Sequence, residues 1–127
     1  MSRLTFTAPP YGFEPETEFE LVPVDGADGL SSLRATRSGV RVFVLDAVPH
    51  LAAYRPRIPA FELAHLGAPP ESDDLRVLVV VNPSGDETTV NLAAPIVVTR
   101  SGGARQVILD GSDWPMRHPL AAALAAA

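Results

Sequence analysis

Along most of the sequence, short runs of hydrophobic residues alternate with prolines, glycines and polar turns. In the run at 18–24, Phe19 and Leu21 share one side of an extended chain and Glu18 and Glu20 share the other, which is the pattern of a half-buried strand. The same reasoning predicts strands at 29–36, 40–48, 75–81, 87–92, 96–100 and 105–110. The pattern predicts a mostly β domain, built as an antiparallel barrel or sandwich.

The run at 40–48 is apolar on both faces, with valines 40, 42 and 44 on one side and Phe43 and Leu45 on the other. We therefore expect a central strand that is covered on both sides. Turns are predicted at 37–39, 82–86 and 101–104, and a polar loop at 67–74.

Three segments are candidates for short helices. Residues 49–54 begin with proline and permit one helical turn, and residues 118–126 permit a short helix. The run at 61–66 fits the period of a helix or of a strand.

The chain has 127 residues without an internal repeat or linker, which predicts a single domain over 1–127. Hydrophobic residues make up 46% and charged residues 20%, a globular composition. The absence of cysteine excludes disulfides and thiol chemistry, and it fits a cytoplasmic location. No signal peptide is expected, and no apolar run approaches the ~20 residues of a membrane span.

The formal net charge is −5, and all ten basic residues are arginine. An acidic chain is poorly suited to binding nucleic-acid phosphates and better suited to meeting a basic protein surface. His50, His65 and His118 lack metal-site spacing, and the serines lack a nucleophile elbow. We expect no catalytic residues, no metal and no cofactor. A hydrolase that uses His50 or His118 with a nearby carboxylate is the disfavoured alternative.

Four glutamates recur at every second position: Glu14, Glu16, Glu18 and Glu20, here called the acidic stripe. In an extended chain these carboxylates project from one face. Two explanations stay open. The stripe is a charged edge that resists strand-on-strand aggregation, or it is a face for a basic partner.

Asn91 is out of place inside a strand, because asparagine is depleted there. It either contacts a partner or closes a bulge or turn before Ala94 and Pro95 with a side-chain hydrogen bond. Three aromatic residues lie either in a partner interface or in the core. Phe13, Tyr54 and Trp114 are of the type that anchors interfaces, although a core position is favoured for each.

Two motifs are fairly specific: TTVNLAAPIVV at 88–98 and RQVIL at 105–109, which are followed by WPMRHPL at 114–120. They resemble motifs of the FliW family of flagellar assembly factors. YGFE at 11–14 is similar to a Pro-Gly-Phe-Glu block of the family, with tyrosine in place of proline. Compared with the family, the chain starts late, and a strand before this block is expected to be missing.

The resemblance implies a compact β-barrel-like domain with little helix. It also implies binding of flagellin and of CsrA, a small basic RNA-binding repressor of flagellin translation. By an allosteric effect such a protein withdraws CsrA from the flagellin messenger RNA, and flagellin competes for it. A chaperone that binds flagellin without antagonising CsrA is the alternative. We expect a free monomer that binds no nucleic acid directly. Its candidate partner-binding residues are Glu14, Glu16, Glu18, Glu20, Asn91 and Pro95.

Overall fold

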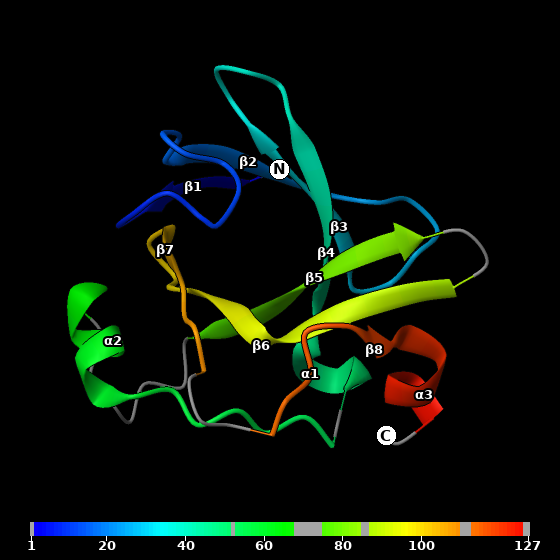
Figure 1. Cartoon of the computed structure of the whole chain (residues 1–127). Coiled ribbons are helices and arrows are strands. Elements are labelled where there is room, and N and C mark those ends of the chain that lie inside the picture. Colours follow the sequence, from blue (N-terminus) through cyan, green and yellow to red (C-terminus); the bar gives the residue numbers. More distant parts are fainter. Residues whose placement is uncertain (1, 52, 68–74, 85–86, 110–112, 126–127) are drawn as a thin grey trace.

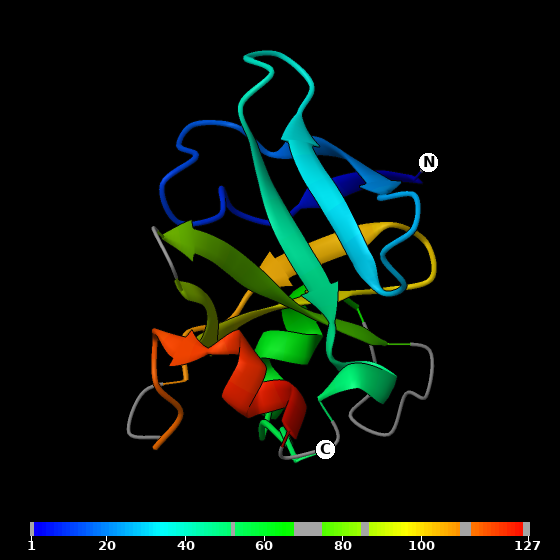
Figure 2. The same cartoon turned by 90° about the vertical axis from the view of Figure 1, so that its right-hand side faces the viewer.

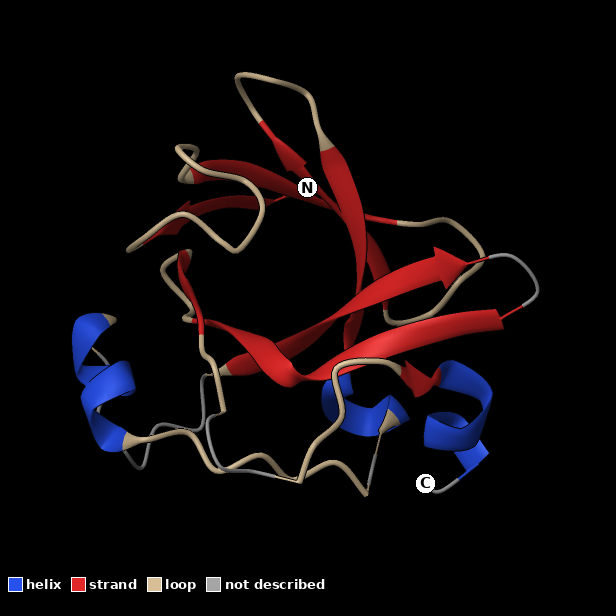
Figure 3. Cartoon of the chain, in the orientation of Figure 1, coloured by secondary structure: helices blue, strands red, loops and turns tan. Residues whose placement is uncertain are grey.

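The computed structural model describes residues 2–51, 53–67, 75–84, 87–109 and 113–125. Its strands are β1 (Ser2–Phe6), β2 (Glu18–Pro23), β3 (Leu30–Ala35), β4 (Arg41–Asp46), β5 (Arg76–Ser84), β6 (Glu87–Val98), β7 (Gly103–Gln106) and β8 (His118–Pro119). Its helices are α1 (Ala47–His50), α2 (Ala60–His65) and α3 (Leu120–Ala125). The mostly β prediction is confirmed (Figure 3).

Seven strands close into a barrel in the order β5-β4-β3-β2-β1-β7-β6, because β6 also pairs with β5. All neighbours in this ring are antiparallel except β1 and β7, which are parallel. The short strand β8 pairs with the other end of the long strand β6. The described helices lie on one side of the barrel, and the β3–β4 turn projects on the opposite side (Figure 1 and Figure 2).

The strand β1 corrects the expectation that no strand precedes the block at 11–14. Leu4 and Phe6 are buried in the barrel, while Thr5 between them is exposed, so the segment alternates as a strand should. Its partner β7 follows Gly102, which has φ +96° and whose absent Cβ would lie 2.8 Å from the Arg3 carbonyl oxygen. A glycine is therefore needed where the two strands meet.

The barrel wall carries hydrophobic side chains on both faces, as predicted for residues 40–48. Val44 of β4 lies in the barrel interior with Phe19, whereas Leu45 packs in a second cluster with Val79 and Tyr54. The strand itself is shorter than predicted, and Val40 before it is 54% exposed. Beneath the barrel, the second cluster continues into a third around Leu63 and Val97, next to α2.

The hairpin of β5 and β6 differs from the sequence prediction in two ways. Asn82 and Pro83 continue β5 instead of starting a turn, and pairing runs on to Ser84 opposite Glu87. In addition, β6 is one strand of 12 residues where two strands were expected, and the register opposite it shifts between Leu78 and Val80. The shift lies in the pairing with β5, and β6 also pairs with β7 near one end and with β8 near the other.

The helical predictions are partly confirmed. The ambiguous run at 61–66 is helix α2, and a helix near the C-terminus begins at Leu120. The turn predicted at 49–54 lies earlier, as helix α1, which is irregular because Val48 has extended backbone angles. Since α1 is a single irregular turn, the regular short helices of the described chain are α2 and α3, which agrees with the one or two that were predicted. The predicted loop at 67–74 and the turn at 82–86 extend into residues outside the described ones.

Candidate partner-binding surfaces

The acidic stripe is not a row of four aligned carboxylates. Only Glu18 and Glu20 lie in β2, where they share a face. Glu14 lies in the loop before it and is exposed. Glu16 is turned toward the β3–β4 turn, where it accepts hydrogen bonds from the Ser38 backbone N–H at 3.1 Å and from the Ser38 hydroxyl. The extended backbone on which the stripe depends therefore begins only at Glu18.

The edge-protection explanation for the stripe is wrong, because β2 pairs with β1 on one side and with β3 on the other. The cross-strand neighbours of Glu20 are Arg3 and Arg34, and Arg34 in turn faces Arg41. Glu20 is thus flanked by positive charge, which favours its place in the sheet. The exposed negative charge of this region comes from Glu14 and Glu18.

A groove lies between the two loops that Glu16 and Ser38 join. Phe13, Glu14 and Pro15 form one wall, and Arg37 and Val40 form the other. The Phe13 side of the groove is held in place by the core, because Phe13 packs edge-to-face on the buried Phe19, with ring centres 5.3 Å apart. Phe13 therefore belongs to the edge of the core, as expected.

The side chain of Asn91 closes the irregular part of β6. Its Oδ1 accepts a hydrogen bond of 3.0 Å from the Ala93 N–H, as the bulge explanation requires. Nearby, the Leu109 N–H donates to the Ala93 carbonyl and the Val107 N–H to the Pro95 carbonyl, so pairing continues beyond β7. Pro95 is fully buried and offers no surface to a partner in this structure. Asn91 is half-buried and does reach a groove.

That groove was missed by sequence reasoning. It lies on one face of the β5–β6 hairpin and is bordered by the segment before β8. Its polar lining residues are Asn82, Glu87, Thr89, Asn91 and Arg117, and we call it the hairpin groove. The available signal was the polar residue at every second position of β6, at 87, 89 and 91, but the segment was interpreted only as a strand with one misplaced asparagine.

An apolar pocket of about 220 Å³ lies on the other side of the segment before β8. Tyr54 and Trp114 meet there edge-to-face at 4.8 Å, and the Tyr54 hydroxyl donates a buried hydrogen bond of 2.7 Å to the Leu92 carbonyl. Burial raises the pKa of the Tyr54 hydroxyl far above its ordinary value. The core position expected for Tyr54 is confirmed, and Trp114 packs against two of the core clusters.

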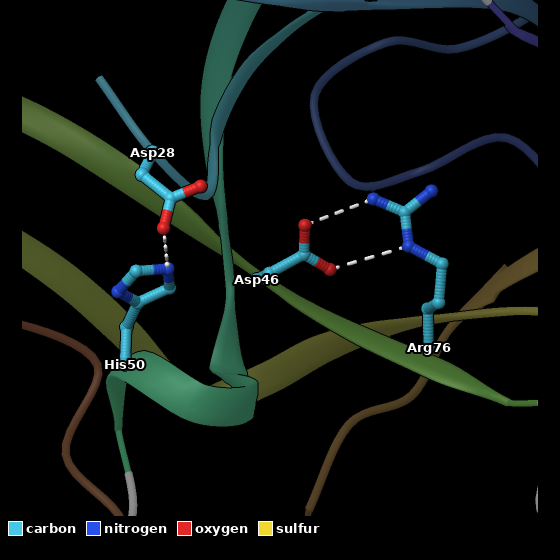
Figure 4. Close-up of polar contacts among 4 residues, drawn as sticks. All are labelled: Asp28, Asp46, His50 and Arg76. Carbon is cyan, nitrogen blue, oxygen red and sulfur yellow. Dashed lines mark hydrogen bonds and ion pairs between the residues drawn. The ribbon is translucent and has the colours of Figure 1, made fainter. Parts of the chain in front are cut away.

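Figure 4 shows two ion pairs, one between β4 and β5 and one between α1 and the β2–β3 loop. The Arg76 guanidinium donates to both carboxylate oxygens of Asp46, at 2.9 and 3.2 Å. The His50 Nε2 lies 3.6 Å from the carboxylate of the exposed Asp28. Among the described residues no three histidines or carboxylates gather in a way that would hold a metal ion. None of the described helices is long and apolar enough to cross a membrane.

Comparisons with a family model and with individual known proteins identify the same family. A family model described as FliW protein matches residues 1–120. The flagellar assembly factor FliW of Clostridioides difficile (strain 630) is 25% identical over 123 residues, which cover 94% of this chain and 95% of that protein. The namesake of Syntrophotalea carbinolica is 31% identical over 113 residues, which cover 87% and 81%.

The fold agrees with this result. The crystal structure of the flagellar assembly factor FliW superposes with a TM-score of 0.83 over 93% of this chain and 84% of that one, at 23% identity. The residues that the family model matches include the whole seven-stranded barrel. The chain therefore belongs to the FliW family of flagellar assembly factors.

Proposed function

We propose that this flagellar assembly factor is a cytoplasmic single-domain protein that binds flagellin and CsrA and thereby relieves repression of flagellin translation. The observation that carries the proposal is the family match over residues 1–120, which includes every strand of the barrel. The protein acts by binding and not by catalysis. It is a monomer when free, and it withdraws CsrA from RNA without contacting the RNA itself.

The charge of the chain supports a basic partner. The net charge is −5, and Glu14 and Glu18 are exposed near the groove between the β1–β2 loop and the β3–β4 turn. Exposed carboxylates speed association with a basic protein and repel the phosphates of its RNA. Glu16 and Glu20 contribute less to such a field, since Glu16 is bound to Ser38 and Glu20 lies between two arginines.

The experiment mixes a preformed complex of CsrA and the flagellin leader RNA with increasing amounts of the purified protein. We expect RNA release, reversal of this release by added flagellin, and a 1:1 complex of the protein with each partner. Binding of flagellin without RNA release would favour the alternative of a chaperone alone. If neither purified partner binds, the proposal is wrong.

Charge reversal tests the acidic surface. In the variant with Glu14→Arg and Glu18→Arg, association with CsrA should slow by about tenfold at low salt, and the difference should shrink as salt is raised. Glu16 and Glu20 stay unchanged, because their replacement would break the Ser38 bonds or create a row of arginines. The control reverses Asp25 and Asp113, exposed carboxylates in other loops, and so makes the same change in net charge. Equal slowing in both variants would place the interface elsewhere.

A further inference from the structure

The hairpin groove gathers polar side chains on one face of two paired strands. Asn82 stands directly opposite Thr89, and Asn91 stands opposite Val80. Directly opposite residues, and residues two apart on one strand, point to the same side of a sheet. The other face of the same strands carries Val81 and Val90, which pack into the second core cluster. Packing of the apolar face in the core therefore holds the polar face of the hairpin in place.

Hydrogen-bond donors of the groove have no acceptor within the described chain. The Asn91 Oδ1 is engaged by the Ala93 N–H, which fixes the amide and leaves its NH₂ group to face the groove. Within the described chain, the side chains of Asn82 and Thr89 make no hydrogen bond, although Thr89 is only 9% exposed. A half-buried polar surface of this kind gains from a ligand that supplies hydrogen-bonding partners.

Opposite charges mark the two ends of the groove. Glu87 lies at the tip of the hairpin, opposite Ser84, and Arg117 lies beside the Val90–His118 pair. Neither forms an ion pair within the part of the chain that the structure describes. From Glu87 to Asn91 the strand advances four residues, or roughly 13 Å at about 3.3 Å per residue. Next to Arg117, Met116 is 66% exposed and adds an apolar contact.

We propose that the hairpin groove binds an extended peptide segment of a partner protein. The amides of Asn82 and Asn91 bond to the peptide backbone, and the segment carries one basic and one acidic residue about four positions apart, which pair with Glu87 and Arg117. An extended peptide matches the groove because its own residues repeat at the spacing of the strand beneath it. The inference rests on the proposed function, which it deepens by naming a surface and the chemistry of the segment that occupies it.

The test uses a capped seven-residue peptide of threonine and valine with one lysine and one glutamate four positions apart. Nuclear magnetic resonance titration of the labelled protein should give saturable shifts at residues 87–92 and 116–118. A matched peptide with two glutamates should bind at least fivefold more weakly. In the variant Arg117→Glu the preference should change to a third peptide with two lysines, because both ends of the groove are then acidic.

The variant Asn91→Asp separates recognition from folding. An aspartate keeps the acceptor for the Ala93 N–H but has no amide to donate, so we expect an unchanged melting curve and at least tenfold weaker peptide binding. The control Ala60→Asp adds the same charge at an exposed position of α2, on the opposite side of the molecule in Figure 1, and should bind within twofold of the parent.

Three results would overturn the groove proposal: chemical shift changes at other residues only, a titration that does not saturate, or peptide binding by Asn91→Asp as tight as by the parent. These outcomes are distinct from failure of the proposed function. If full-length flagellin or CsrA binds while no peptide does, the groove proposal fails and the proposed function stands. If the peptide binds in the groove and neither full-length partner binds the protein, the proposed function fails and the groove stands.

Discussion

At the scale of single residues, Asn91 and Gln106 of the 88–98 and 105–109 motifs form hydrogen bonds with the backbone. Gln106 accepts a hydrogen bond from the Tyr11 N–H at 2.7 Å and donates to the Ala94 carbonyl at 3.2 Å. It thereby ties β6 and β7 to the loop that follows β1. With Asn91 bound to the Ala93 N–H, the motif holds the irregular strand β6 in shape. A specific sequence motif here marks a structural requirement of the fold.

Replacing Tyr54 by phenylalanine tests a buried hydrogen bond. The change removes the donor to the Leu92 carbonyl and should lower the free energy of unfolding by about 1–3 kcal/mol at pH 7, as measured by urea denaturation. The effect should depend on pH. Because the pKa of the Tyr54 hydroxyl is raised in the folded protein, its stabilisation is complete below the unfolded value of about 10 and is lost as pH rises above it.

The difference between the parent and the phenylalanine variant should therefore narrow above about pH 10. The other tyrosine, Tyr11, is exposed and present in both proteins, so it does not contribute to the difference between them. A difference that stays constant up to pH 11, or a variant as stable as the parent at pH 7, would contradict this account of the bond.

At the scale of elements, strands with alternating side chains were predictable and their ends were not. Residues 18–21 alternate between glutamates and the buried Phe19 and Leu21, and β2 differs from the prediction by one residue. The strand β1 is five residues long with only two buried side chains, too weak a pattern to stand out. Asn82 and Pro83 are typical turn residues, but they continue β5 because Thr89 and Thr88 of β6 stand opposite them.

The candidate site was less predictable than the fold, for a physical reason. The alternation of glutamates at 14–20 has meaning only if the backbone is extended, and a turn before β2 removes that condition for Glu14 and Glu16. Which arginines flank Glu20 depends on strand register, which pairs residues far apart in the chain. The hairpin groove likewise needs Arg117 beside β6, a neighbour that no local pattern could indicate.

One charged pair joins α2 to the barrel, in addition to the apolar packing of Leu63. The Arg105 Nε donates to the Glu62 Oε1 at 3.0 Å, and its Nη1 donates to the Thr7 hydroxyl at 2.8 Å. Glu62→Gln keeps the size of the side chain but removes the charge, which should weaken this bond by about 1 kcal/mol. We expect hydrogen exchange in α2 to become roughly five- to tenfold faster.

The strands β2 and β3 should exchange as before in that variant, because they do not contact the pair. Glu14→Gln removes the same charge from an exposed loop and serves as the control. Uniformly faster exchange across the barrel would mean that the pair supports the whole fold and not the helix alone.

At the scale of the whole molecule, the N-terminal strand completes the barrel. Deleting residues 1–6 removes Leu4 and Phe6 from the core and leaves the edges of β2 and β7 without partners. We expect the truncated protein to lose cooperative urea unfolding and to aggregate, since open edges pair with other chains. Truncation after Leu120 removes exposed residues of α3 and should leave a cooperative transition. A cooperative transition of the N-terminal deletion at the parental midpoint would show that six strands suffice.

The pairing of β1 with β7 also affects when the barrel can fold during synthesis of the chain. The two strands lie near opposite ends of the sequence, so the ring cannot close until the chain has been synthesised through Gln106. Contacts between such distant segments slow folding, because a long loop must be ordered before they form. A nascent chain therefore exposes the unpaired edge of β1 throughout most of its synthesis. Closure of the ring therefore follows the emergence of nearly the whole chain from the ribosome.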